Sequence, residues 1–259
     1  ESAYIYNTIA DLYRKQGLFN QAEPLLLKAI EIFEETPNKE TETLEAMQSL
    51  ALLYSEMGAN NAAEKIYLDL IDIKEEIFGK FHDKTLISKH SLVMHYLQEG
   101  LYDKGKELIV KTLANKEKIS LQSPRSLAMI LGTLGTIYST KGNYKESLNV
   151  RLEALAVHEK ALGKNHPENA FYHLSLGNAY TDLGNLTKAE KVYLNALSMR
   201  KKTLGEDDPR LELFHDGLAD LYKSKGHYKK AEEIFLRQLN NEENFYGKND
   251  IALIQSHKN

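Results

Sequence analysis

Apolar residues recur along this chain with a short period and a long one. In the short period they are three or four residues apart, as at Leu131, Leu134 and Tyr138, which is the spacing of one face of an α-helix. Gly142 follows, and a glycine at this point ends a helix readily because it adopts a left-handed backbone. A second amphipathic stretch begins near Tyr144. The pattern therefore predicts two helices joined by a short turn.

The long period repeats this helix pair along the whole chain. Each first helix is followed by a glycine, at Gly17, Gly58, Gly100, Gly142, Gly184 and Gly226. The first two glycines are 41 residues apart, and each later one follows the previous one by 42. A tyrosine stands four residues before each glycine: Tyr13, Tyr54, Tyr96, Tyr138, Tyr180 and Tyr222. A fixed period in this range is the signature of a solenoid, in which each unit buries its apolar face against its neighbours.

The repeat predicts an all-α fold with no sheet. We expect one array over residues 1–259, with twelve helices in six antiparallel pairs that form a right-handed superhelix. The expected repeats are approximately 3–36, 41–79, 83–121, 124–163, 167–205 and 209–247. Residues 250–259, which open with Asp250, are expected to start a further helix without a partner. Since solenoid ends need polar caps, that end is predicted to pack on a second copy of the chain.

Two positions within each repeat suit close helix packing. Seven residues before the glycine the residue is mostly small, and it is glycine at Gly135 and Gly177. Small residues there would let two helices approach closely. The second helix of the fourth repeat has a buried stripe that includes Ser147, Arg151 and Ala154.

Composition narrows the classes of function. The net charge of −4 and the pI near 6.2 disfavour nucleic-acid binding, which usually needs a basic surface. The chain has no cysteine, and no apolar run is long enough to span a membrane. We therefore expect no nucleic-acid or membrane partner. A cytoplasmic location is expected, although the first residue is Glu1 and the chain has the look of a fragment.

The residues that recur in each helix pair resemble the tetratricopeptide repeat. The tyrosine, the glycine, the small residue five positions later and alanines such as Ala29, Ala154 and Ala196 match its pattern. The 42-residue period and the segments LGKNHPENA (162–170) and LGEDDPRLE (204–212) are similar to a subfamily found in kinesin light chains and many bacterial multidomain proteins. The resemblance implies a helical solenoid that binds a protein or peptide.

In such a fold the first helices line the concave side. Solvent-facing residues should lie thirteen, ten, six and three positions before each glycine. The candidate peptide-binding residues on this face are Asn7, Asp11, Arg14, Gln48, Leu52, Ser55, Ile87, His90, Met94, Leu97, Thr136, Ser139, Asn178, Thr181, Asp220 and Lys223.

Two features of this face could mark a ligand site. Leu52, Ile87, Met94 and Leu97 would form an exposed apolar patch, unless neighbouring repeats bury them against each other. The second feature is a row of hydroxyls nine positions before the glycines, at Thr8, Ser49, Ser91, Thr133 and Ser175. This row could bind a peptide backbone, or it could be a tolerated polar row between helices.

The resemblance also suggests ligands that this sequence disfavours. A clamp for two carboxylates needs lysine and arginine beside asparagine on successive inner faces, and the positions ten before the glycines hold no cation. Peptides with an aromatic residue in acidic surroundings need basic groove residues, whereas here Arg14 and Lys223 stand at opposite ends. We therefore expect neither specificity.

No residue set indicates catalysis, a metal or a cofactor. His90 and His95 are five residues apart and so lie on different helix faces. There is no glycine-rich phosphate loop and no nucleophile beside a base. The leading interpretation is a non-enzymatic scaffold that binds a protein or peptide in its groove. The alternative is a regulatory or sensor segment of a larger protein whose effector, such as a caspase-like protease or an NTPase, lies outside this chain.

Overall fold

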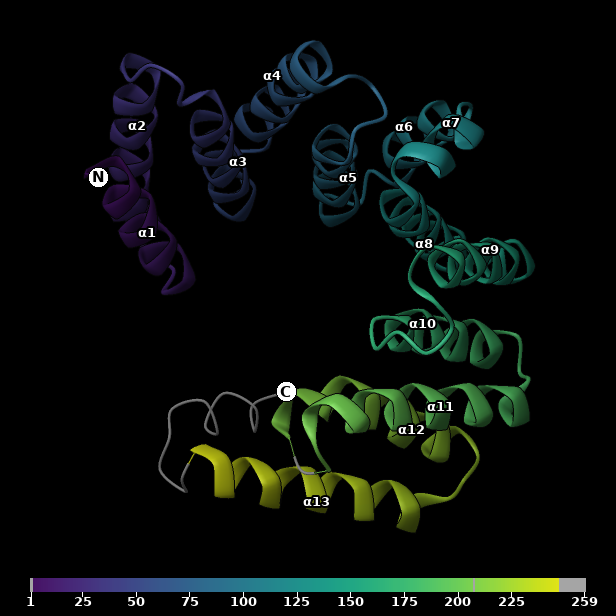
Figure 1. Ribbon diagram of the computed structural model, residues 1–259. Helices are drawn as coiled ribbons and strands as arrows, with labels where there is room; N and C mark the ends of the chain where they lie inside the picture. The colour runs from purple at the N-terminus through teal and green to yellow at the C-terminus, as the bar shows by residue number, and fades with distance from the viewer. Residues whose placement is uncertain (1, 207, 247–259) are drawn as a thin grey trace. The chain divides into compact units, whose positions relative to one another are not determined.

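The computed structural model describes residues 2–206 and 208–246, with side chains described as far as residue 241. Over these residues the chain forms thirteen α-helices and one short 3-10 helix, with no strand (Figure 1). The chain divides into two compact units, Glu1–Ser126 and Leu127–Asn259. The all-α prediction is confirmed, whereas the predicted helix beginning at Asp250 lies outside the described residues.

The first unit contains the helices of the first three repeats. They are α1 (Ser2–Lys15), α2 (Phe19–Glu35), α3 (Glu40–Glu56), α4 (Asn60–Phe78), α5 (Asp83–Gln98), α6 (Tyr102–Leu113) and α7 (Lys116–Gln122). Each of α1 to α6 packs on the helix that follows it, which is the sequential pairing expected of stacked hairpins.

The second unit contains the remaining repeats. Its helices are α8 (Pro124–Thr140), which begins just before the boundary, α9 (Tyr144–Leu162), α10 (Asn169–Asp182), α11 (Leu186–Leu204), η1 (Pro209–Leu211), α12 (Glu212–Ser224) and α13 (Tyr228–Tyr246). Consecutive helices from α9 to α13 again pack on one another. No helix among the described residues is long and apolar enough to cross a lipid bilayer.

The repeated glycine ends each first helix in the predicted way. All six of these glycines have φ between 72° and 75°, where residues with a Cβ are disfavoured. After α8, the Gly142 amide donates to the Ser139 carbonyl at 2.9 Å, and the Asn143 amide donates to the Tyr138 carbonyl at 2.8 Å. This pair of bonds is a Schellman cap, and the same pair recurs in every repeat. The glycine therefore sits where the turn requires a left-handed residue.

The repeated tyrosine joins neighbouring repeats through its hydroxyl. The hydroxyl of Tyr54 donates to Glu23 at 2.7 Å, and that of Tyr96 donates to Glu64 at 2.6 Å. The glutamate always stands six residues after the glycine of the preceding repeat, and Tyr222 makes the same bond in the second unit. Two tyrosines lack a glutamate at that position, because lysine or leucine occupies it. The stacking of repeats is thus partly specified by a polar pair that is visible in the sequence.

The third repeat departs from the predicted pairing, because its second helix is split into α6 and α7. The break falls at Asn115, and asparagine is a poor helix former. This repeat has Leu121 where the second, fourth and fifth repeats end their second helices with a glycine, and Leu121 is 87% exposed. Ile119 is fully buried instead, and the Ser123 hydroxyl donates to the Phe81 carbonyl at 2.8 Å. The count of thirteen helices rather than twelve follows from this break.

Close helix approach at the small positions is confirmed. Ala10 and Ala51 are fully buried. A Cβ added at Gly177 would lie 2.4 Å from the ring of Tyr193, and one added at Gly135 would lie 2.7 Å from Cγ of Arg151. Real Cβ atoms essentially never come so close, so at these two positions only glycine fits the packing as it stands.

Candidate functional site

All sixteen predicted site residues lie on the first helices of their repeats. In the first unit they are Asn7, Asp11 and Arg14 on α1, Gln48, Leu52 and Ser55 on α3, and Ile87, His90, Met94 and Leu97 on α5. In the second unit they are Thr136 and Ser139 on α8, Asn178 and Thr181 on α10, and Asp220 and Lys223 on α12.

Other side chains of the first unit already engage the predicted residues Ser55, Arg14, Asp11 and Gln48. Ser55 is only 4% exposed, and its hydroxyl shares a hydrogen bond of 2.8 Å with Nδ1 of the buried His95. The prediction that Ser55 faces solvent is therefore wrong, because a histidine from the next repeat covers it. Arg14 pairs with Glu56 at 2.5 Å and with Asp11 at 2.7 Å. Its charge is already neutralised.

The predicted apolar patch is exposed for the most part. Leu52 is 38% exposed, and Ile87 and Met94 are each 47% exposed. Leu97 is half-buried, so among the four residues it alone fits the alternative in which neighbouring repeats bury the patch.

An apolar hollow of about 230 Å³ lies beside this patch in the first unit. Its lining residues are Thr41, Leu44, Glu45, Gln48, Lys74, Phe78, Lys84 and Ile87. Lys74 is buried there, and its ammonium group donates to the Ser88 hydroxyl at 2.7 Å. Burial lowers the pKa of Lys74, as does the nearby charge of Lys84.

A polar hollow of about 360 Å³ lies in the second unit. Its lining residues are Thr136, Ser139, Thr140, Arg151, Asn178, Thr181, Asp182, Tyr193, Gly217, Asp220, Leu221 and Ser224. Five of the six residues predicted for this unit are among them. Lys223 is not, but its ammonium group donates to Asp220 at 3.0 Å. The structure therefore gathers the predicted residues of α8, α10 and α12 around one cavity.

The hollow also contains Arg151, which sequence reasoning assigned to the buried stripe of a second helix. The other repeats have Leu26, Tyr67, Ile109, Tyr193 and Phe235 at this position. The Arg151 side chain passes over Gly135 and donates from Nε to the Ser147 hydroxyl at 3.1 Å. Nη1 donates to the carbonyl and hydroxyl of Ser175. The signal that could have revealed this residue was an arginine at an apolar position, paired with a glycine on the facing helix.

With this geometry in view, the sequence model of the tetratricopeptide repeat matches residues 1–76, 126–202 and 169–244, which is more than half of the chain. The chain belongs to the tetratricopeptide repeat family. No curated protein sequence is similar enough to the chain to count as a match.

Several solved structures share this fold at low sequence identity. BtubC (BKLC) from P. vanneervenii is 19% identical, with a TM-score of 0.70, over 96% of this chain and 94% of that one. A repeat protein described as a kinesin light chain from Podosopora anserina is 21% identical, with a TM-score of 0.61, over 78% and 95% of the two chains. A Rap protein complexed with competence and sporulation factor is 17% identical, with a TM-score of 0.59, over 94% and 75%.

The hydroxyl row of this tetratricopeptide repeat array already forms hydrogen bonds within the chain. The hydroxyls of Thr8, Ser49, Ser91 and Thr133 each donate to the carbonyl four residues earlier in their own helix, at 2.8 to 3.2 Å. Ser175 accepts from Arg151. Four of the five hydroxyls thus already donate within their own helices, which favours the interpretation of a tolerated polar row.

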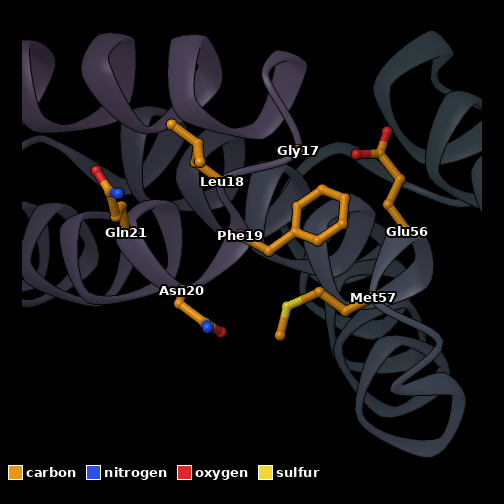
Figure 2. A pocket seen from close by; sticks show the side chains of 7 residues that line it. All are labelled: Gly17, Leu18, Phe19, Asn20, Gln21, Glu56 and Met57. Carbon is orange, nitrogen blue, oxygen red and sulfur yellow. The ribbon is translucent and has the colours of Figure 1, made fainter.

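A third hollow, of about 370 Å³, lies at a turn of the first tetratricopeptide repeat (Figure 2). Its lining residues are Gly17, Leu18, Phe19, Asn20, Gln21, Glu56 and Met57. None of the predicted site residues is among them, and Phe19 and Met57 pack against a core cluster of the first unit. This hollow is therefore a weaker candidate than the polar one.

Among the described residues no group of three or more His, Cys, Asp or Glu side chains could hold a metal ion. His95 is buried against Ser55 and the ring of Tyr67, whose centroid is 5.8 Å away. The histidine therefore has a packing role.

Proposed function

We propose that this tetratricopeptide repeat array is a non-enzymatic scaffold that binds a peptide segment of a partner protein in the polar hollow of the second unit. The observation that carries the proposal is the convergence of Thr136, Ser139, Asn178, Thr181 and Asp220 from three first helices on one cavity. Pockets with several convergent polar groups fix the orientation of a ligand.

The Rap protein gives a precedent for a chain of this fold that binds a separate factor. That protein was solved in complex with competence and sporulation factor, and its chain is similar to most of this one.

Filling the hollow tests the proposal. Nonapeptides would be selected from a displayed library on the wild-type chain, and their affinities measured for Thr136→Trp and for Lys191→Trp. Thr136 is exposed in the hollow, whereas Lys191 is exposed on α11 and does not line it. We expect Thr136→Trp to weaken binding by about tenfold or more, which is about 1.4 kcal/mol, and Lys191→Trp to leave it unchanged. Equal binding by both variants would place the peptide elsewhere.

A further inference from the structure

The hydroxyl groups of the polar hollow already donate their hydrogens to acceptors within the chain. Thr140 donates to the Thr136 carbonyl at 3.0 Å, Thr181 donates to the Gly177 carbonyl at 3.0 Å, and Ser224 donates to the Asp220 carbonyl at 2.9 Å. A hydroxyl has one hydrogen and two lone pairs. These three groups therefore offer a ligand lone pairs and no hydrogen.

The remaining hydroxyls behave in the same way. Ser139 donates to the carboxylate of Asp182, and Tyr193 donates to the side-chain oxygen of Asn178 at 2.6 Å. Thr136 points its hydroxyl at the Gly132 carbonyl at 3.4 Å. The hydroxyls of the wall therefore present acceptors to a ligand, and the side-chain nitrogen of Asn178 is a donor that stands among them.

Two carboxylates add to this acceptor surface. Asp182 and Asp220 both line the hollow and are exposed. Asp220 pairs with Lys223 one helical turn away, and the side chains of both are more than half exposed. Such exposed pairs contribute little, so Asp220 can exchange Lys223 for a ligand at small cost.

Arg151 does not reverse this character. Three of its hydrogen bonds go to Ser147 and Ser175, and Nη2 lies 3.4 Å from the Thr136 hydroxyl. It is 7% exposed, and the nearby charge of Asp182 offsets its own. The guanidinium therefore has no open pair of N–H groups with which to grip an incoming carboxylate. The two carboxylates outnumber this single buried cation.

We propose that the group of the peptide that enters this hollow is basic: the ammonium of a lysine or the guanidinium of an arginine side chain. Both present several N–H donors and a positive charge, which complement lone pairs and carboxylates. This inference rests on the proposed function and specifies the chemistry of the ligand at the same site.

Defined peptide pools test the inference. Fluorescein-labelled, amidated nonapeptides would carry random uncharged flanks and a fixed central lysine, arginine, glutamine or glutamate, and binding would be followed by fluorescence anisotropy. We expect the lysine and arginine pools to bind about tenfold more tightly than the glutamine pool, with the glutamate pool weakest, since hydrogen bonds between charged groups are about twice as strong as neutral ones.

Matched variants assign the preference to the hollow. Asp182→Asn/Asp220→Asn should reduce the lysine and arginine pools to the level of the glutamine pool. The control is Asp69→Asn/Asp72→Asn, which removes two exposed carboxylates from α4 and should leave the preference intact. Circular dichroism checks that both variants are folded.

The outcomes separate the two proposals. The inference is overturned if the glutamate pool binds best, if all pools bind alike, or if the basic preference survives in Asp182→Asn/Asp220→Asn. Failure of every pool to bind the wild-type chain would instead contradict the proposed function itself.

Discussion

The apolar hollow of the first unit and the polar hollow of the second are built on the same repeat but differ in chemistry. Both contain a buried cation, Lys74 in one and Arg151 in the other. Lys74 has one hydroxyl partner, Ser88, and stands beside Phe78 and other apolar side chains. Arg151 is held by two serines and faces hydroxyls and carboxylates.

The two hollows are lined by different positions of the same repeat. Glycine at the turn and small residues between the helices are demanded by the backbone, and they recur in both units. The apolar hollow is lined at positions thirteen and ten before the glycine, as at Ile87 and Gln48, whereas the polar hollow is lined at positions six and three before it, as at Thr136 and Thr181. A solenoid keeps its fold and changes its ligand chemistry in this way.

The largest expected effect separates packing from surface on α5. Leu92 is buried, and Leu92→Ala should reduce the free energy of unfolding by about 2–5 kcal/mol. Met94, two residues away, is exposed, and Met94→Ser should change it by less than about 0.5 kcal/mol. Urea unfolding of the two variants measures both. An equal loss would move Met94 from the apolar patch to the core.

The glycines of the second unit give the next effect. Gly177→Ala should destabilise the fold by about 1–3 kcal/mol, because the new Cβ would collide with the rigid ring of Tyr193. Gly132→Ala on α8 meets nothing within 4 Å and should stabilise the helix by about 0.5–1 kcal/mol. Thermal unfolding of the pair checks the sign. Stabilisation in both would mean that the Tyr193 ring can move aside.

Removing the two buried cations tests the comparison directly. Lys74→Met should be neutral or stabilising by about 1 kcal/mol, since a buried charge whose hydrogen bond goes to a hydroxyl is replaced by an apolar side chain of similar length. Arg151→Met should destabilise by about 1–2 kcal/mol, because Ser175 loses its donor in a half-buried site. Denaturant midpoints at equal slope measure both changes. The same sign for both would remove the distinction drawn between them.

A smaller effect concerns the tyrosine that joins repeats. Tyr96→Phe removes the hydroxyl that donates to Glu64 and should cost about 0.5–1.5 kcal/mol. Tyr180→Phe is the matched change in the second unit, where leucine replaces the glutamate, and should be close to neutral. The difference between the two unfolding free energies is the measured quantity, and a difference near zero would deny the tyrosine–glutamate bond a role in stacking.

The smallest effect is a dependence on pH. Burial lowers the pKa of His90 in the first unit and of His173 and His215 in the second. Their contribution to stability is fully present above the unfolded pKa, near 6.5, and is lost as the pH falls below it, because the unfolded chain binds protons first. Unfolding free energies measured between pH 7.5 and about pH 5 should therefore decline. The variant His173→Gln/His215→Gln should show a flatter decline, and an unchanged slope would exclude these two residues as its source.

The sequence by itself determined the helix pairs, their turns and the helices that carry the candidate residues. It could do so because these features are local: a left-handed glycine caps each first helix, and small residues recur at a fixed distance from it. The tyrosine–glutamate pairs between repeats are also legible once the period is known.

Only the tertiary structure decided which residues meet. The burial of Ser55 depends on His95, which belongs to the next repeat. On α7, the burial of Ile119 and the exposure of Leu121 are likewise set by packing. Arg151 reaches the hollow by crossing Gly135 on a facing helix. Each outcome depends on packing between helices far apart in the chain, where the spacing of residues along one helix carries no information about the side chains that approach it.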